Sequence, residues 1–324
     1  MHLFVALPLF LWPLLFSWQA CGAHPDLRFD FALIGDTPYT AEQETNLFPN
    51  MIAELNAHKL AFVVHDGDIK SGGAPCTDDV FHERFRQFQT FRNPLVYLFG
   101  DNEWSDCGHN TNHPFAPEER LQKLRELFTQ GHRSLGQRTI ALQRQSDVPG
   151  FGKYRENVRW NFGNILFAGL NVPGSDNHVG TPEYNERNAA NLAWIRETFA
   201  IGRKDNFRAL MFISQANPNF ELAATNRARG GFNDMLRLFE RESVAWERQV
   251  VYVHGDSHYF RIDQPLVSSV SHRRIENFTR AETYGNPDVH WLQVSVDWRD
   301  PNVFTFRPRH VRKNLVNHSA IPKK

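Results

Sequence analysis

Phe31-Ala32-Leu33-Ile34-Gly35-Asp36 opens the part of this chain that decides its fold, because a short apolar run ends there in a glycine and an aspartate. An apolar run followed by Gly-Asp returns three times further along the chain. The acidic turns are Gly35-Asp36-Thr37-Pro38-Tyr39, Gly67-Asp68-Ile69-Lys70, Gly100-Asp101-Asn102-Glu103 and Gly255-Asp256-Ser257-His258. Buried strands of α/β folds end at the sheet edge where ligands bind. We therefore expect the carboxylates to meet at one edge, in an arrangement that suits a multivalent cation.

Strand and helix patterns alternate along the chain, which predicts an α/β protein with parallel strand pairing. Strands are expected at residues 28–34, 60–65, 95–99, 138–143, 154–160, 165–170, 209–214 and 250–253. Helices are expected at residues 41–59, 78–92, from 117 onward, 182–199 and around 232–239. Three later segments, residues 259–262, 290–296 and 303–306, are spaced closely enough to form a second, mainly antiparallel sheet. The pattern predicts two sheets enclosed between helices.

The first residues of the chain have the composition of a secretory signal peptide. Leu3 to Trp18 is almost wholly apolar, and the small residues of Ala20-Cys21-Gly22-Ala23 suit a signal peptidase. A membrane span needs about 20 apolar residues, whereas this run is shorter and is interrupted by Pro8 and Pro13. We expect residues 1–23 to be removed and the protein to be secreted or periplasmic, with no stable membrane span afterwards; a lipoprotein anchor at Cys21 is the alternative.

The charge balance argues against a nucleic-acid or membrane-surface partner. Lys plus Arg and Asp plus Glu each total 36, so no overall field attracts an anionic polymer. The sequence has no internal repeat and no low-complexity linker, which predicts a single domain over residues 24–324. The composition does not set an oligomeric state.

The predicted mature chain keeps two cysteines, Cys76 and Cys107. An even number of cysteines in an exported protein predicts a disulfide, which would tie the Gly67 turn to the Gly100 turn. The alternative is a pair of buried, unpaired thiols. A thiolate zinc site is disfavoured because the sequence has no CxxC pair.

The order and spacing of these turns resemble the calcineurin-like metallophosphoesterases. The blocks of that family run Asp-x-His, Gly-Asp, Gly-Asn-His-Asp or Glu, a lone His after a strand, and Gly-His-x-His, and the resemblance extends from Phe29 to about Phe306. It implies a four-layer α/β/β/α sandwich, with two mixed sheets flanked by helices. It also implies an exported hydrolase of a small phosphomonoester or phosphodiester, acting through a hydroxide activated by two divalent ions (Mn, Fe, Mg, Ca or Zn).

The resemblance assigns metal ligands position by position. Asp36, Asp68 and His258 would hold the first metal ion. Asp68 would bridge to a second ion, whose other ligands would be Asp101, Gln215 and Asp256. Tyr39 is a further candidate for the first ion, as a tyrosine is in some phosphatases of this superfamily; the alternative is a packed turn aromatic.

Several family positions carry other residues here. Pro38, Gln215 and Asp256 stand where the family has histidines, so oxygen donors favour harder ions such as Mn²⁺, Mg²⁺ or Ca²⁺ at the second site. Asn102 replaces the histidine credited with protonating the leaving group, and an amide cannot donate a proton at neutral pH. His109 and His113, on the same loop, are candidate substitutes, although exposed loop histidines are an equally good interpretation.

Two other classes of function are open to a chain with these replacements. One is a catalytically impaired protein of the same fold that binds a ligand or partner in the ancestral cleft. The other is a Ser-His-Asp hydrolase, which is disfavoured because the chain lacks a Gly-x-Ser-x-Gly elbow.

Overall fold

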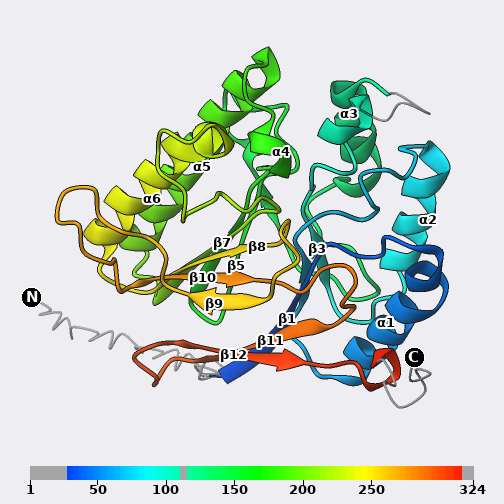
Figure 1. Ribbon diagram of the computed structural model, residues 1–324. Helices are drawn as coiled ribbons and strands as arrows, with labels where there is room; N and C mark the ends of the chain where they lie inside the picture. Colours follow the sequence, from blue (N-terminus) through cyan, green and yellow to red (C-terminus); the bar gives the residue numbers. More distant parts are fainter. Residues whose placement is uncertain (1–27, 110–114, 316–324) are drawn as a thin grey trace, which may run out of the picture.

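The computed structural model describes residues 28–109 and 115–315, so the predicted signal peptide and His113 lie outside the described residues. Two sheets stand face to face between two groups of helices, which confirms the predicted four-layer α/β/β/α sandwich (Figure 1). One sheet has five strands in the order β12-β11-β1-β2-β3, and the other has seven in the order β4-β5-β6-β7-β8-β10-β9.

The strands of the five-stranded sheet are β1 (Arg28–Ile34), β2 (Val63–His65), β3 (Leu95–Tyr97), β11 (Trp291–Asp297) and β12 (Phe304–Arg309). Those of the seven-stranded sheet are β4 (Gln143–Arg144), β5 (Val158–Phe162), β6 (Ile165–Gly169), β7 (Ala209–Ile213), β8 (Val250–His254), β9 (Arg261–Asp263) and β10 (Phe278–Glu282). Within the two sheets, β1 to β3 run parallel, and so do β6, β7, β8 and β10. The sheets are therefore mixed, and the carboxyl ends of their central strands share one edge.

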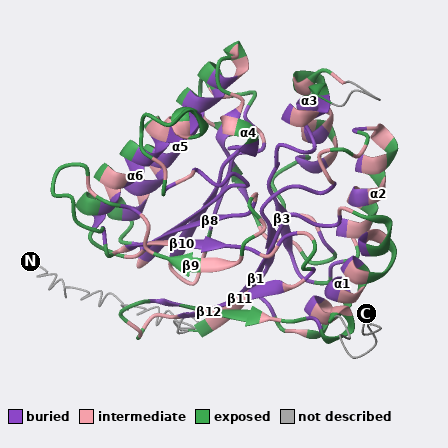
Figure 2. Cartoon of the chain, viewed as in Figure 1, coloured by how far each residue is buried: buried purple, intermediate pink, exposed green. Residues whose placement is uncertain are grey.

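The helices divide between the two outer faces. They are α1 (Phe48–Ala57), α2 (Asp78–Phe88), α3 (Pro117–Phe128), α5 (Pro182–Lys204) and α6 (Asn233–Trp246). The short segment labelled α4 (Gly174–Asn177) is a single turn that contains left-handed residues. Figure 1 shows α1, α2 and α3 on the side of the five-stranded sheet, and α5 and α6 on the other side. Each of these outer helices turns its buried face toward the sheet (Figure 2).

Side-chain alternation along β1 shows how one strand supports two layers. Ala32 and Ile34 belong to the core beneath α1 and α2, whereas Phe31 and Leu33 belong to the core between the two sheets. Successive side chains of a strand point to opposite faces, so a strand covered on both faces is apolar throughout. The continuous apolar run of the sequence follows from this double burial.

Local signals set where several helices begin. The Thr77 hydroxyl accepts a hydrogen bond from the backbone N–H of Val80 and caps α2. Thr181 caps α5 in the same way, accepting from Tyr184 N. The predicted helix 41–59 is divided, because a π-helical turn, Gln43–Leu47, precedes α1. Pro49 lies in the first turn of α1, where its missing N–H is not needed.

The prediction that the C-terminal strands form a sheet of their own is wrong. β9 joins the edge of the seven-stranded sheet, while β11 and β12 join the five-stranded sheet. β11 pairs antiparallel with β1, where Arg28 lies opposite Asp297. The sequence prediction also missed β10, which lies between β8 and β9. β11 pairs with the free edge of β1, and β10, followed by β9, pairs with the free edge of β8. Pairing with these existing sheets satisfies more backbone N–H and C=O groups than a separate small sheet would.

Within residues 28–109 and 115–315, the helices are too short or too polar to cross a bilayer.

Candidate metal centre

The predicted ligands come together at the shared carboxyl edge of the two sheets. Asp36 follows β1, Asp68 follows β2, Asp101 follows β3, and Asp256 follows β8. The backbone N–H of Asp256 donates to both carboxylate oxygens of Asp36, each 3.1 Å away, so the turns of the two sheets are directly joined. Gln215, which follows β7, accepts the N–H of Gly255 on its backbone oxygen at 3.0 Å. The edge thus gathers side chains that are far apart in the sequence.

Glycines make room for these carboxylates. A Cβ atom on Gly255 would lie 2.0 Å from Oδ2 of Asp36, and one on Gly100 would lie 2.1 Å from Oδ1 of Asp68. No side chain larger than hydrogen fits at such distances. Each of these two Gly-Asp pairs therefore has two functions: its aspartate supplies a carboxylate, and its glycine accommodates the carboxylate of another turn.

Four of the predicted ligands have left-handed backbone conformations. The φ angles are 48° for Asp36, 59° for Asp68, 75° for Asp256 and 56° for His258. Such conformations are uncommon outside glycine and cost on the order of 1 kcal/mol or more each. Strained residues cluster at functional sites, because the surrounding structure holds them there for their side chains.

The first group of donor atoms surrounds the Tyr39 hydroxyl. This oxygen lies 2.8 Å from Oδ2 of Asp68, 3.4 Å from Oδ1 of Asp36 and 3.3 Å from Nε2 of His258. Nε2 of His258 lies 3.5 Å from the same oxygen of Asp36. Tyr39, which the sequence offered only as a further candidate, is the centre of this group.

The second group of donors lies beside the segment that follows β6. Ser175 Oγ donates to Oδ2 of Asp101 at 2.8 Å, and the N–H of Gly174 donates to Oε1 of Gln215 at 2.6 Å. Asn217 N donates to Oδ2 of Asp256 at 2.9 Å. Oδ1 of Asp101 and Nε2 of Gln215 are buried and have no hydrogen-bond partner within the described part of the chain.

The fit of this site to a metal ion depends on the neutral donors. Among the described residues, no group of three or more His, Cys, Asp or Glu side chains is gathered as a metal site. The carboxylates alternate instead with the Tyr39 hydroxyl and with the Asn102 and Gln215 amides. Ligand atoms bound at about 2.1 Å in octahedral geometry lie about 3.0 Å apart. The separations around Tyr39, 2.8 to 3.5 Å, match that spacing, so the set fits a hard cation once Tyr39 is counted.

The acidic groups of this site have raised pKa values, because they are buried close to one another. Burial and the charges of Asp101, Glu103 and Asp36 raise the pKa of Asp68 well above its ordinary value. Burial, with the charge of Asp256, raises the pKa of Asp101 to about 8, and burial raises that of Asp256 to about 6. Burial and neighbouring carboxylates also raise the pKa of Tyr39. A bound cation would replace the protons that these groups otherwise hold.

Two buried glutamates hold the turns in place. Glu103 accepts hydrogen bonds from the N–H groups of Asp68, Ile69 and Gly100, at 3.1, 3.4 and 2.6 Å. Glu282, at the end of β10, accepts from the Ser257 hydroxyl and from Tyr259 N, and so fixes the turn that carries His258. Glu282 was not predicted as part of the site, because β10 was not predicted.

Asn102 and His109, the predicted catalytic residues, lie in different surroundings. Asn102 faces the site, where its Nδ2 donates to Oδ2 of Asp68 at 2.6 Å and to the Tyr39 hydroxyl at 3.0 Å. The His109 side chain is 81% exposed and lies 3.9 Å from Oδ1 of Asp106. The structure thus brings Asn102, but not His109, into the group of donor atoms.

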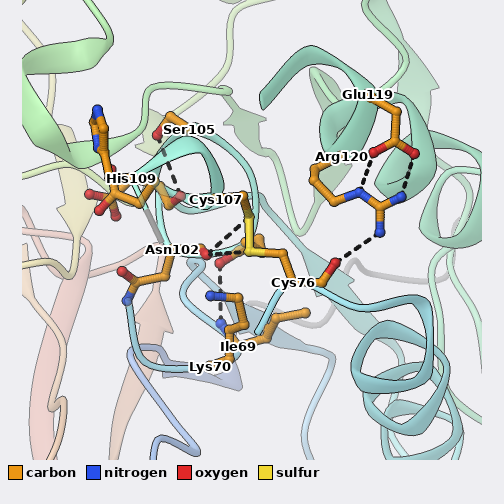
Figure 3. Close-up of a disulfide and its surroundings, with 12 residues drawn as sticks. Ile69, Lys70, Cys76, Asn102, Ser105, Cys107, His109, Glu119 and Arg120 are labelled. Atoms are coloured by element: carbon orange, nitrogen blue, oxygen red, sulfur yellow. Dashed lines mark hydrogen bonds and ion pairs between the residues drawn. A yellow bond between two sulfur atoms is a disulfide. The ribbon is translucent and has the colours of Figure 1, made fainter. Parts of the chain in front are cut away.

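The disulfide between Cys76 and Cys107 forms as predicted and lies directly behind Asn102. Its two sulfur atoms are 3.6 and 3.7 Å from the Asn102 carbonyl oxygen (Figure 3). Lys70, on the Gly67 turn, lies nearby, and its ammonium donates to the Ser71 carbonyl at 3.0 Å. The bridge therefore joins the Gly67 and Gly100 turns next to the site.

The segment after β6 carries an unusual turn next to the site. Ser175, Asp176, Asn177 and His178 have φ angles of 47°, 56°, 57° and 56°, a left-handed turn of four residues that are not glycine. This conformation costs about 1–2 kcal/mol per residue, less for Asn and Asp. The sequence signal was Gly-Ser-Asp-Asn at residues 174–177, which follows β6 after the four buried residues 170–173.

Comparison with solved structures supports the fold assignment. No family model and no curated protein matches the chain. The chain superposes on the structure of PhoD with a TM-score of 0.55 and 12% identity, over 84% of this chain and 64% of PhoD. It also resembles GAP50, described as the anchor in the inner membrane complex of Plasmodium, with a TM-score of 0.49 and 10% identity over 87% of this chain and 89% of GAP50. For the 5'-nucleotidase from Candida albicans the TM-score is 0.43 and the identity 11%, over 86% of this chain and 50% of the nucleotidase.

This chain therefore has the fold of PhoD, the α/β/β/α sandwich that the resemblance to the metallophosphoesterases implied, at low sequence identity. The fold assignment rests on PhoD, of which this chain spans 64% of the length.

Proposed function

We propose that this protein is an exported, metal-dependent hydrolase of a small phosphomonoester or phosphodiester. The observation that supports this function most is the convergence of acidic turns from both sheets at one edge, in a fold shared with PhoD. The left-handed backbone of Asp36, Asp68, Asp256 and His258 supports it further, because their strain is retained where their side chains meet.

We assign Asp36, Asp68, Tyr39 and His258 to the first cation. Asp68 is also assigned to the second cation, together with Asp101, Gln215 and Asp256. Two divalent cations at such a site supply an activated water and neutralise charge on the phosphate oxygens. Burial raises the pKa values of Asp68 and Asp101, so these carboxyl groups would give up protons when cations bind, and Tyr39, whose pKa is also raised, would give up its phenolic proton.

Asn102 limits which esters the protein can cleave. Its amide is placed to donate hydrogen bonds, as it now does to Asp68, but it cannot transfer a proton to a departing oxygen. His109 faces solvent and lies near Asp106, so the described residues offer no imidazole there as a substitute. Esters with acidic leaving groups, such as aryl phosphates, need no general acid and are the substrates we expect to react fastest.

A compartment that preserves disulfides agrees with this assignment. Cys76 and Cys107 are both fully buried and bridged, as is common in secreted or periplasmic proteins.

The test is metal-dependent turnover. Protein stripped with a chelator is reloaded with Mn²⁺, Mg²⁺, Fe or Zn²⁺ and assayed on an aryl phosphomonoester and an aryl phosphodiester. We expect turnover that needs added metal and is lost in Asp68→Asn, while Asp234→Asn on the exposed face of α6 retains it. Absence of metal-dependent turnover on both esters would contradict the proposal.

One observation favours a second candidate function, a binding module without turnover. Asn102 and Tyr39, two neutral donors, both hydrogen-bond to the Asp68 carboxylate, at 2.6 and 2.8 Å. For such a module, the stripped protein would bind inorganic phosphate or a phosphate ester without cleaving it, whichever metal is added.

A further inference from the structure

One segment contacts every side chain that we assign to the second cation alone. Ser175 Oγ lies 2.8 Å from Oδ2 of Asp101, and Gly174 N lies 2.6 Å from Oε1 of Gln215. A Cβ atom on Gly174 would lie 2.6 Å from Oδ2 of Asp101 and 2.8 Å from Oδ1 of Asp256, so the backbone itself packs against both carboxylates. Gly174 and Ser175 therefore form one wall of this half of the site.

The Ser175 contact decides which oxygen of Asp101 stays available. Ser175 takes one oxygen of Asp101, and the other oxygen is left buried and unpaired within the described residues. The carboxylate is thus held by one oxygen while the second stays free. A group that orients a ligand from behind in this way typically changes metal affinity 10- to 100-fold when it is removed.

The backbone of the turn is held in its left-handed form by contacts from other elements. Asp176 Oδ1 accepts from Gly231 N at 3.0 Å, and Asn177 Nδ2 donates to Gly231 O at 2.8 Å. Arg187 of α5 donates to Oδ1 of Asn177 at 2.6 Å. These bonds anchor Asp176 and Asn177, whereas the exposed residue Ser175 is anchored to the acidic site itself.

We propose that Ser175 is a positioning residue for the second cation, and that the left-handed turn exists to present its hydroxyl to Asp101. The inference rests on the proposed metal-dependent function. With right-handed backbone angles at position 175, the backbone would run in a different direction, and the Ser175 hydroxyl would no longer reach the Asp101 carboxylate. Backbone strain at this position is retained for the orientation of Asp101.

The experiment separates the hydroxyl from the strain. Ser175→Ala removes the hydroxyl and keeps a residue that disfavours positive φ, whereas Ser175→Gly removes the hydroxyl and the strain together. Glu247→Gly is the matched control, because Glu247 has a φ of 62° at the exposed end of α6, away from the acidic turns. Mn²⁺ binding to the stripped protein is followed by calorimetry, and the melting temperature is measured without metal.

We expect the parent to bind Mn²⁺ in two steps. Both Ser175 variants should weaken one step by about 10- to 100-fold and leave the other unchanged. Ser175→Gly should melt at a higher temperature than Ser175→Ala, because only the glycine relieves the backbone strain, and Glu247→Gly should bind Mn²⁺ as the parent does.

Parental affinities at both steps in the Ser175 variants would overturn this inference and leave the metal-dependent function standing. A parent that binds no Mn²⁺ would overturn both. Equal weakening of both steps would also contradict the inference, because Ser175 contacts Asp101 and not the shared ligand Asp68.

Discussion

The phenolic oxygen of Tyr39 lies 2.8 Å from Oδ2 of Asp68, so a single hydroxyl joins the turn that ends β1 to the turn that ends β2. The same oxygen is 3.4 Å from Asp36 and 3.3 Å from His258. A phenol placed among carboxylates either donates its proton to one of them or loses it to a cation. This relationship makes Tyr39 the residue at which the proposed metal centre can be tested most directly.

Replacing Tyr39 with Phe should weaken cation binding by about tenfold or more, because one donor of the first group is lost while the ring is kept. Loading with Fe³⁺ gives a spectroscopic check, since an iron-bound phenolate absorbs visible light. We expect the absorption in the parent and in Tyr154→Phe, which changes a tyrosine outside the acidic turns. A visible band that persists in Tyr39→Phe would argue against ligation by Tyr39.

Asp68→Asn should cost more bound metal than Asp256→Asn. Asp68 is assigned to both cations and Asp256 to one, so the first substitution removes a charge from each half of the site. Metal content after purification without chelators, measured by mass spectrometry, compares the two. Equal retention of metal by both variants would remove the bridging role of Asp68.

Asn102→His should accelerate the hydrolysis of alkyl phosphates relative to aryl phosphates. An imidazole at this position can donate a proton to a poor leaving group, which is worth about 10²-fold or more in favourable cases. The rates of the parent and the variant are compared over esters of rising leaving-group pKa. A variant with the same dependence on leaving-group pKa as the parent would show that Asn102 does not face the departing oxygen.

The stripped protein should lose stability as pH rises from about 6.5 to about 8. The pKa of Asp101 is raised to about 8 by burial and by the charge of Asp256. The proton it holds stabilises the folded state at low pH, and that contribution disappears as pH rises through this value. Burial lowers the pKa values of His65 and His254 to about 3, so these histidines oppose the trend only below about 6.5.

Melting temperatures across this pH range test the prediction, and saturating Mn²⁺ or Asp101→Asn should flatten the profile. A melting temperature of the stripped parent that rises from pH 6.5 to 8 would contradict it.

Removal of the disulfide should loosen the site as well as the fold. Cys76 and Cys107 are separated by 31 residues, and the closure of such a loop is worth about 3–4 kcal/mol of unfolding free energy. Because both sulfur atoms lie against the Asn102 carbonyl, the Cys76→Ser, Cys107→Ser double variant should also bind Mn²⁺ more weakly. Scanning calorimetry measures the loss of stability, and titration calorimetry measures the affinity for Mn²⁺. The parent protein with its disulfide reduced serves as the comparison. Lower stability with unchanged Mn²⁺ affinity would limit the bridge to a structural role.

Local sequence determined the beginnings of this architecture. Phe31 to Ile34 is apolar at every position because β1 is covered on both faces, and that run alone indicates a buried strand. The Gly-Asp pairs that follow the apolar runs mark where these strands end. These features depend on residues adjacent in the chain, so they can be read from it.

Tertiary structure alone decided which strands became neighbours and which groups completed the site. The alternation along β11 suits either sheet, and its pairing with β1 joins residues as distant as Arg28 and Asp297. The left-handed turn at Ser175 is stabilised by Gly231 and Arg187 through contacts with the two residues that follow it. Such conformations cost free energy locally and are repaid only by distant partners, so no local pattern in the sequence records them.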